Sequence, residues 1–246
     1  MDYLLGKLQQ IGVPESDIDA LRYFRQRGVF TFADENYPDR FSEDMSDGKI
    51  PLIPLFRDWD SNYVCVYTDG PLKGMVCIEI HDMRDLAPVS RTIKNFLNAA
   101  NRLSDEDAEY CYYYDFVRDY QDDLDFPLTE GKYIDPADKE RRERLIEMYN
   151  ETDDKEIRSD LQNSIYALTP KDELEDTVLV LLEKKEYFYK AIDLIDRYRY
   201  TSAVEKLITI LEQSRLPASQ RSRLRWSINQ LAPGRLPRKA WWQFWK

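Results

Sequence analysis

His81 is the one histidine of the chain and the only side chain that titrates near neutral pH at its ordinary pKa. It follows a β-branched stretch and lies beside Asp82, so an acid–base role is chemically conceivable. Catalysis needs an arranged set of groups, and no serine or cysteine nucleophile is tied to this histidine by a motif. We therefore expect a structural, hydrogen-bonding histidine and no catalytic residue.

Metal and cofactor chemistry has little support in the residue types. Asp58, Asp60 and Asp69 offer oxygen ligands for calcium, but they lack the loop with a terminal bidentate glutamate that such sites use. Phosphate-cradling glycine loops and zinc-protease motifs are missing from the sequence. An odd number of cysteines without a CxxC pair argues against a disulfide framework and a zinc knuckle. We expect no metal and no cofactor. The cysteines are Cys65, Cys77 and Cys111.

The clearest candidate for function is an acidic run that also carries tyrosines. Between Asp105 and Glu130 there are ten acidic residues and one basic residue, Arg118. Such a surface repels nucleic acid and attracts basic partners. The candidate partner-binding residues are Asp105, Asp107, Glu109, Tyr112, Tyr114, Asp115, Asp119, Asp122, Asp123 and Asp125.

Two interpretations of this run remain open. The acids can form a solvated surface that keeps the protein soluble, and the tyrosines can pack between two halves of the chain. Alternatively, acids and aromatics together face a partner, because aromatic side chains are enriched at binding surfaces. In that case the run mimics the charge of a nucleic-acid backbone and occupies the groove of a basic nuclease.

The C-terminal end has the opposite charge. From Gln213 to Lys246 there are eight basic residues and no acidic residue. The end itself, Ala240–Lys246, has four aromatic residues. This composition favours contact with a membrane surface or a hydrophobic groove of a partner, and folding back onto the helices is the alternative. Short aromatic, cationic ends also point to a bacterial source.

Overall composition fits a globular chain. Its 246 residues are 43% hydrophobic, 33% charged and 13% aromatic, which argues against disorder. No apolar run is long enough to cross a membrane, and the first residues do not start a signal peptide. We expect a soluble, cytoplasmic protein without a transmembrane segment.

The first half has the pattern of a small α+β domain. Helices are expected at 3–10 and near 16–24, and the proline-containing stretch 50–56 fits an edge strand or a strand entering a sheet. Residues 62–67 and 75–80 are β-branched and aromatic, with turn residues between them, which predicts a hairpin.

Alternation in that hairpin predicts which side chains share a face. Val64 and Val66 point to one side, whereas Cys65 and Tyr67 point to the other. A helix over about 89–102 has an apolar stripe and is expected to cover the sheet.

The second half predicts helices alone. Apolar stripes separated by short breaks indicate helices that lie antiparallel to their neighbours. Residues 157–185 and 190–215 each consist of a helix, a break and a helix, at a spacing of about thirty residues. This pattern resembles short HEAT-type helical repeats, and a plain helical bundle is the alternative.

Residues 48–102 contain a series of short motifs in a fixed order. They are Ile50–Pro51–Leu52, the acidic turn Asp58–Asn62, the strand Asn62–Val66, a second strand after Gly74, His81–Asp82, and a helix with Phe96 and Leu97. This order resembles the SUKH superfamily of Smi/Knr-like α+β proteins. The resemblance implies a non-enzymatic binding domain, because many bacterial members look like immunity proteins that neutralise a toxin, often a nuclease, and eukaryotic members act as scaffolds.

Together these patterns predict an α+β domain at 1–134, with a small antiparallel sheet covered by helices. An all-α helical-repeat or bundle domain follows at 135–232, with a basic aromatic tail at 233–246. We expect a non-enzymatic protein-binding protein, an immunity protein that neutralises a toxin through its acidic surface. The alternative is a scaffold or adaptor that binds an endogenous partner through its helical repeats. An enzyme would require a site built from scattered acids.

Overall fold

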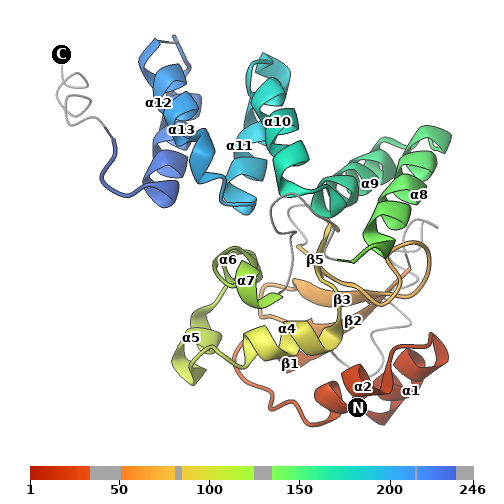
Figure 1. Cartoon of the computed structure of the whole chain (residues 1–246). Coiled ribbons are helices and arrows are strands. Elements are labelled where there is room, and N and C mark those ends of the chain that lie inside the picture. The colour runs from red at the N-terminus through yellow and green to blue at the C-terminus, as the bar shows by residue number, and fades with distance from the viewer. Residues whose placement is uncertain (34–50, 81–84, 125–134, 214, 237–246) are drawn as a thin grey trace. The chain divides into compact units, whose positions relative to one another are not determined.

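Five strands form one antiparallel sheet in the first part of the chain, and they lie side by side in sequence order (Figure 1). The computed structural model describes residues 1–33, 51–80, 85–124, 135–213 and 215–236. The strands are β1 (Thr31–Phe32), β2 (Leu52–Arg57), β3 (Tyr63–Tyr67), β4 (Val76–Glu79) and β5 (Pro88–Ser90).

The central strand β3 is buried along its whole length. Val64 and Val66 belong to one hydrophobic core, whereas Cys65 and Tyr67 belong to another on the opposite face of the sheet. The predicted hairpin of β3 and β4 and the predicted division of its faces are confirmed. A strand with two buried faces needs a helical layer on each side.

Strand β2 lies inside the sheet, where it pairs with β1 on one side and β3 on the other. The prolines of this stretch had indicated an edge strand or a strand entering a sheet. Pro54 is accommodated because the register between β2 and β3 shifts between Pro54 and Phe56, which is the irregular kind of position where a strand tolerates proline.

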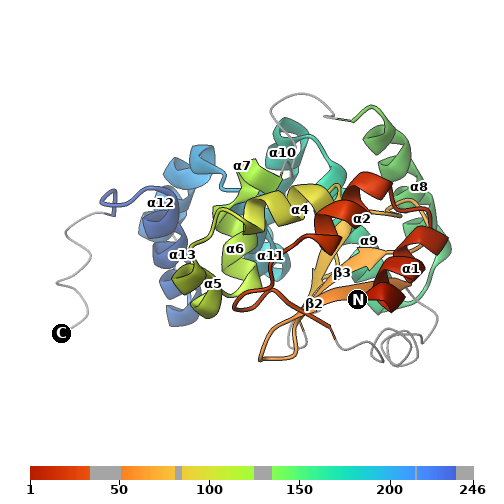
Figure 2. The same ribbon diagram turned by 90° about the horizontal axis from the view of Figure 1, so that it is seen from below.

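Among the described residues, six helices contribute to the core on the face of Val64 and Val66. Helix α4 lies beside α2 (Figure 2). Phe30 is the centre of the aromatic packing, with ring centroids 5.3 Å from Phe116 and 6.1 Å from both Phe56 and Phe96. The helices are α1 (Asp2–Gln10), α2 (Glu15–Arg22), α4 (Ile93–Ala100), α5 (Asp105–Tyr110), α6 (Tyr113–Asp119) and α7 (Gln121–Leu124).

Helix α4 starts later than the expected helix over 89–102. Val89 is in β5, and the side chain of Thr92 caps the helix by accepting a hydrogen bond from the backbone N–H of Asn95 at 3.1 Å. The apolar stripe in the sequence does not distinguish the last residues of a buried strand from the first turn of a buried helix. The predicted helix therefore began too early.

The opposite face of the sheet is covered by α8 (Ala137–Glu151) and α9 (Lys155–Leu168). Leu145 and Leu161 from these helices share a core with Cys65 and Tyr67. The Tyr67 hydroxyl donates to the carbonyl of Leu86 and also interacts with Ser164 of α9, so a buried polar group is satisfied at this junction.

The chain divides into two compact units, residues 1–171 and 172–246. This division differs from the predicted boundary between 134 and 135. The reason is that the two helices assigned to the second domain, α8 and α9, complete the core of the sheet. The first of the two predicted helical pairs, 157–185, is therefore split between the units.

The residues that follow the predicted boundary lead directly into α8. Asp138 is fully buried, 2.5 Å from Arg91 and 2.9 Å from Arg141. Asp135 also pairs with Arg141, at 2.8 Å, and this hydrogen bond lowers the pKa of its carboxyl. The ion pair of Asp138 with Arg91 connects the first turn of α8 with the loop between β5 and α4.

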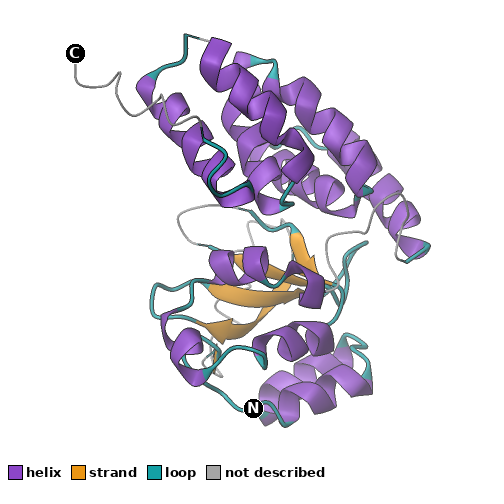
Figure 3. Ribbon diagram, turned by 60° about the vertical axis from the view of Figure 1, so that its left-hand side comes forward, coloured by secondary structure: helices purple, strands orange, loops and turns teal. Residues whose placement is uncertain are grey.

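The second unit is helical throughout its described residues (Figure 3). Helices α11 and α12 both pack against α13. Buried Asp196 of α11 accepts a hydrogen bond from Ser227 of α13 at 2.8 Å and pairs with Arg223 at 2.8 Å. The helices are α10 (Lys171–Leu182), α11 (Phe188–Arg197), α12 (Val204–Gln213) and α13 (Ala218–Leu231), with short 3₁₀ turns at Lys185–Tyr187 and Thr201–Ala203.

Candidate protein-binding surface

The turn between β2 and β3 is closed by the buried carboxylate of Asp58. Its Oδ1 accepts hydrogen bonds from the backbone N–H groups of Asp60 at 2.9 Å and Asn62 at 2.8 Å, and its Oδ2 accepts one from the Asn62 side chain at 2.8 Å. Ser61 adopts a φ of 64°, in the left-handed region. The carboxylate of Asp58, one of the oxygen ligands considered for calcium, is therefore occupied by hydrogen bonds that fix the turn.

This turn holds Trp59 against Tyr112, the residue that precedes α6. The two ring centroids are 6.5 Å apart in an edge-to-face arrangement, with an interplanar angle of 73°. Trp59 is 53% exposed and Tyr112 is 55% exposed, so each ring keeps much of its surface open to solvent. We call these two residues the Trp59–Tyr112 pair.

The acidic segment, residues 104–123, is anchored to the loop before β1. Gly28 has a φ of 49°, and a β-carbon added there would overlap the backbone carbonyl of Ala108 in α5. The same carbonyl accepts a hydrogen bond from the N–H of Val29 at 3.0 Å, and the Tyr113 hydroxyl donates to the carbonyl of Val29 at 2.5 Å. The acidic segment is therefore held in place by close backbone packing.

Four arginines neutralise part of the acidic segment in the described structure, and three of them come from distant parts of the sequence. Only one of them, Arg118, lies in the run itself, where its hydrogen bond with Asp119 raises the pKa of its guanidinium. Exposed pairs of this kind contribute at most about 1 kcal/mol each, but they do reduce the local negative charge. The pairs are Arg25–Asp105 at 2.8 Å, Arg27–Asp105 at 3.4 Å, Arg118–Asp115 at 2.8 Å, Arg118–Asp119 at 2.8 Å, and Arg102–Asp123.

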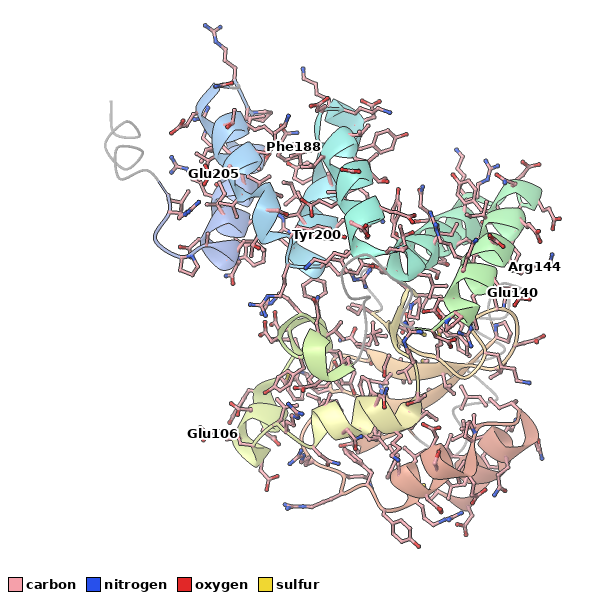
Figure 4. All side chains as sticks on the ribbon, in the orientation of Figure 1. Glu106, Glu140, Arg144, Phe188, Tyr200 and Glu205 are labelled. Atoms are coloured by element: carbon pink, nitrogen blue, oxygen red, sulfur yellow. The ribbon has the colours of Figure 1, made fainter. Side chains whose placement is uncertain are left out.

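Other acidic residues, close to Trp59 or Tyr112 in the sequence, have no cationic neighbour in the part of the chain that the structure describes. Within the described residues, no arginine or lysine lies at ion-pair distance from Asp60, Glu106 or Glu109. Glu106 lies on the outer side of α5 (Figure 4). Asp107 differs, because its backbone and carboxylate are engaged by Ser104, which caps α5. In the described part of the turn and of α5, Asp60, Glu106, Asp107 and Glu109 therefore keep a negative charge without a cationic partner.

The tyrosines of the acidic segment divide between the two interpretations that the sequence left open. Tyr113 is buried in the core with Phe116. Tyr110 is 75% exposed and Tyr112 is also exposed, while Tyr114 is half-buried. Some of these aromatic residues therefore pack in the core, and others face solvent.

The position of Cys111 in the acidic segment changes the pKa of its thiol. Burial raises its pKa to about 11, with further contributions from the negative charges of Asp115, Asp119 and Asp107. Cys65 and Cys77 are fully buried between the strands and α9, and burial raises the pKa of both thiols as well. Nucleophilic cysteines need the opposite shift.

Several predicted residues fall outside what the structure describes. Asp125, His81 and the aromatic end at 237–246 lie outside the described residues. Asp122 is in α7, but its side chain is outside the description. Over the described ranges, no group of three or more histidine, cysteine or acidic side chains is arranged to hold a metal ion. None of the helices described here has the length and apolar character needed to cross a bilayer.

Trp59 and the distant arginines were not identified from the sequence as parts of this surface. The available signal was a tryptophan between two aspartates in a hairpin turn, a position where a bulky aromatic side chain cannot be buried easily. The pairing of Trp59 with Tyr112 depends on the fold, since the two residues are far apart in the chain.

Comparison with known proteins gives no further identification. No family model, no curated protein and no solved structure matches this chain.

Proposed function

We propose that this chain is a non-enzymatic protein-binding protein that binds a basic protein through the acidic segment and the Trp59–Tyr112 pair. The observation that carries the proposal is the contact between two exposed aromatic rings, on segments of the chain whose acidic residues Asp60, Glu106 and Glu109 have no cationic neighbour in the described structure. Aromatic anchors with complementary charge around them are typical of protein interfaces.

A non-enzymatic role fits the chemistry of the thiols, whose pKa values are raised rather than lowered. We place the protein in the cytoplasm, where free thiols such as those of Cys65 and Cys77, which pair across neighbouring strands, stay reduced.

The partner that best fits this surface is a basic nuclease toxin, so that the protein acts as an immunity protein of the SUKH type. A nuclease groove binds phosphates with basic residues and bases with flat side chains. The carboxylates of this surface offer the negative charge of a phosphate, and its exposed aromatic rings offer the flat surface of a base. Occupation of the groove would block access of nucleic acid.

A scaffold function is the second candidate, and it is supported by exposed apolar side chains in the second unit. Tyr187, Tyr189, Trp226 and Val180 all expose more than a third of their surface. These positions are on or next to helices, as expected for a helical surface that binds an endogenous partner.

The test mixes the full chain with the protein that is encoded by the gene next to its own. Complex formation is measured first, and nuclease activity second. We expect binding that weakens with salt, and inhibition of the nuclease. Glu106→Gln with Glu109→Gln should slow association. The matched control is Asp176→Asn with Glu186→Gln, which changes the net charge equally but lies in the second unit.

The two candidates give different results. Loss of binding only with the variants at Glu106 and Glu109 supports the acidic segment. Loss of binding only with the variants at Asp176 and Glu186 supports the scaffold function. Equal, small effects of both would show that net charge alone governs the interaction.

A further inference from the structure

The Trp59–Tyr112 pair has the features of a site for a cation. Aromatic rings attract lysine and arginine side chains through their electron-rich faces, most strongly when the ring is tryptophan. In the part of the chain that the structure describes, no lysine or arginine lies over either ring. Arg57, the last residue of β2 and the basic residue closest to Trp59 in the sequence, lies over Tyr63, 5.7 Å from its ring centroid, and donates to Ser61 at 2.9 Å.

The two rings are held in place before any partner arrives. Three hydrogen bonds to the carboxylate of Asp58 fix the turn that carries Trp59. Tyr112 lies next to Tyr113, whose hydroxyl is bonded to Val29 in the core. Because both backbones are fixed, binding costs little ordering of the chain.

Carboxylates adjoin the pair on both sides along the chain. Asp60 follows Trp59 directly, and Glu109 precedes Tyr112 by three residues. Neither has a cationic neighbour in the described structure. The β2–β3 turn and α5 therefore each carry a carboxylate close in sequence to one of the two rings.

We propose, on the basis of the function proposed above, that the Trp59–Tyr112 pair receives a lysine or arginine side chain from a basic segment of the partner protein. The rings bind the cation and the adjoining carboxylates balance its charge. Nucleic acid does not fit this site, because the same carboxylates repel phosphate.

The test uses the full chain and a hexalysine peptide that carries a neutral dye, with fluorescence anisotropy as the readout. Trp59→Leu and Tyr112→Ala remove one ring each and leave every charge in place. Each should weaken binding by about two- to fivefold, the effect of an exposed cation–π contact. Tyr110→Ala is the matched control, since Tyr110 is an exposed tyrosine of the same segment without a ring partner in the described structure.

A second measurement locates the contact. The chain has five tryptophans, and 5-fluorotryptophan labelling gives a ¹⁹F resonance for each, with that of Trp59 assigned from the Trp59→Phe variant. The Trp59 resonance should shift in a saturable way with hexalysine and stay in place with the same peptide after acetylation of its lysines. Melting temperatures of all variants confirm that they are folded.

The outcomes separate this inference from the proposed function. If both ring variants bind hexalysine as tightly as the native chain while Asp60→Asn with Glu109→Gln weakens binding, the cation site is wrong and the charge-based function stands. If the native chain does not bind hexalysine at all, both proposals are overturned.

Discussion

Asp17 in α2 caps a helix to which it does not belong. Its Oδ1 accepts a hydrogen bond of 2.6 Å from the backbone N–H of Lys94, in the first turn of α4. The carboxylate is buried and lies where the helix dipole favours negative charge. This hydrogen bond connects α2 and α4, which are far apart in the sequence.

We expect Asp17→Ala to lower the free energy of unfolding by about 1–2 kcal/mol, because a buried N–H group and the start of a helix lose their acceptor. Asp17→Asn keeps an acceptor oxygen and should lower it less. Asp19→Ala, at a half-exposed neighbour paired with Arg22, is the control. Urea denaturation measures the differences, and equal effects at both positions would contradict the capping role.

Gly28 is predicted to be essential for the position of the acidic segment. Gly28→Ala should destabilise the fold by about 2–4 kcal/mol, because the new methyl group overlaps a backbone carbonyl and the left-handed φ strains the residue. Gly6→Ala is the opposite control: Gly6 lies inside α1 with open space around it, and alanine should stabilise the helix by about 0.5–1 kcal/mol. Thermal and chemical denaturation compare the two. A Gly28→Ala variant as stable as the native chain would be inconsistent with this packing.

Cys111 should react slowly at neutral pH. Since alkylation requires the thiolate, the rate should keep rising beyond pH 9 and level off near its pKa of about 11. The folded state holds this proton more tightly than the unfolded state, so the associated stability is present below the unfolded pKa and is lost as the pH rises toward 11. Asp115→Asn with Asp119→Asn should lower the midpoint. A rate that levels off at pH 9 in the native chain would show that neither burial nor these charges act on the thiol.

The boundary at 171 leads to a prediction about fragments. Residues 1–171 should fold cooperatively, whereas residues 1–134 lack α8 and α9 and leave one face of the sheet uncovered. The shorter fragment should expose Cys65 and Cys77 to thiol reagents and lose cooperative melting. Equal protection of these thiols in the two fragments would mean that α8 and α9 are dispensable for the sheet.

The sequence predicted local features well because local rules govern them. Alternation within residues 62–67 and 75–80 was sufficient to assign the two faces of the hairpin. The stripe of α8 and α9 showed that each helix buries one side, but a stripe does not specify which apolar surface it meets. For that reason the second layer on the sheet, and with it the boundary at 171, was not predicted.

The candidate surface was predicted in part for a similar reason. The run of acids and tyrosines is a local pattern and could be recognised, but which of its tyrosines are exposed could not, since Tyr110 is exposed and Tyr113 is buried. Its arginine partners, Arg25, Arg27 and Arg102, come from other elements and depend on the tertiary fold. Trp59 joins Tyr112 only through the same fold.

The edges of the sheet have a consequence for behaviour at high concentration. In the described structure, one edge is β1, a strand of two residues, and the other is β5, a strand of three residues that begins with Pro88. Long rows of unpaired N–H and C=O groups act as templates for pairing with other chains, and short or proline-containing edges do not. Neither of these two edge strands therefore offers a long template for edge-to-edge aggregation.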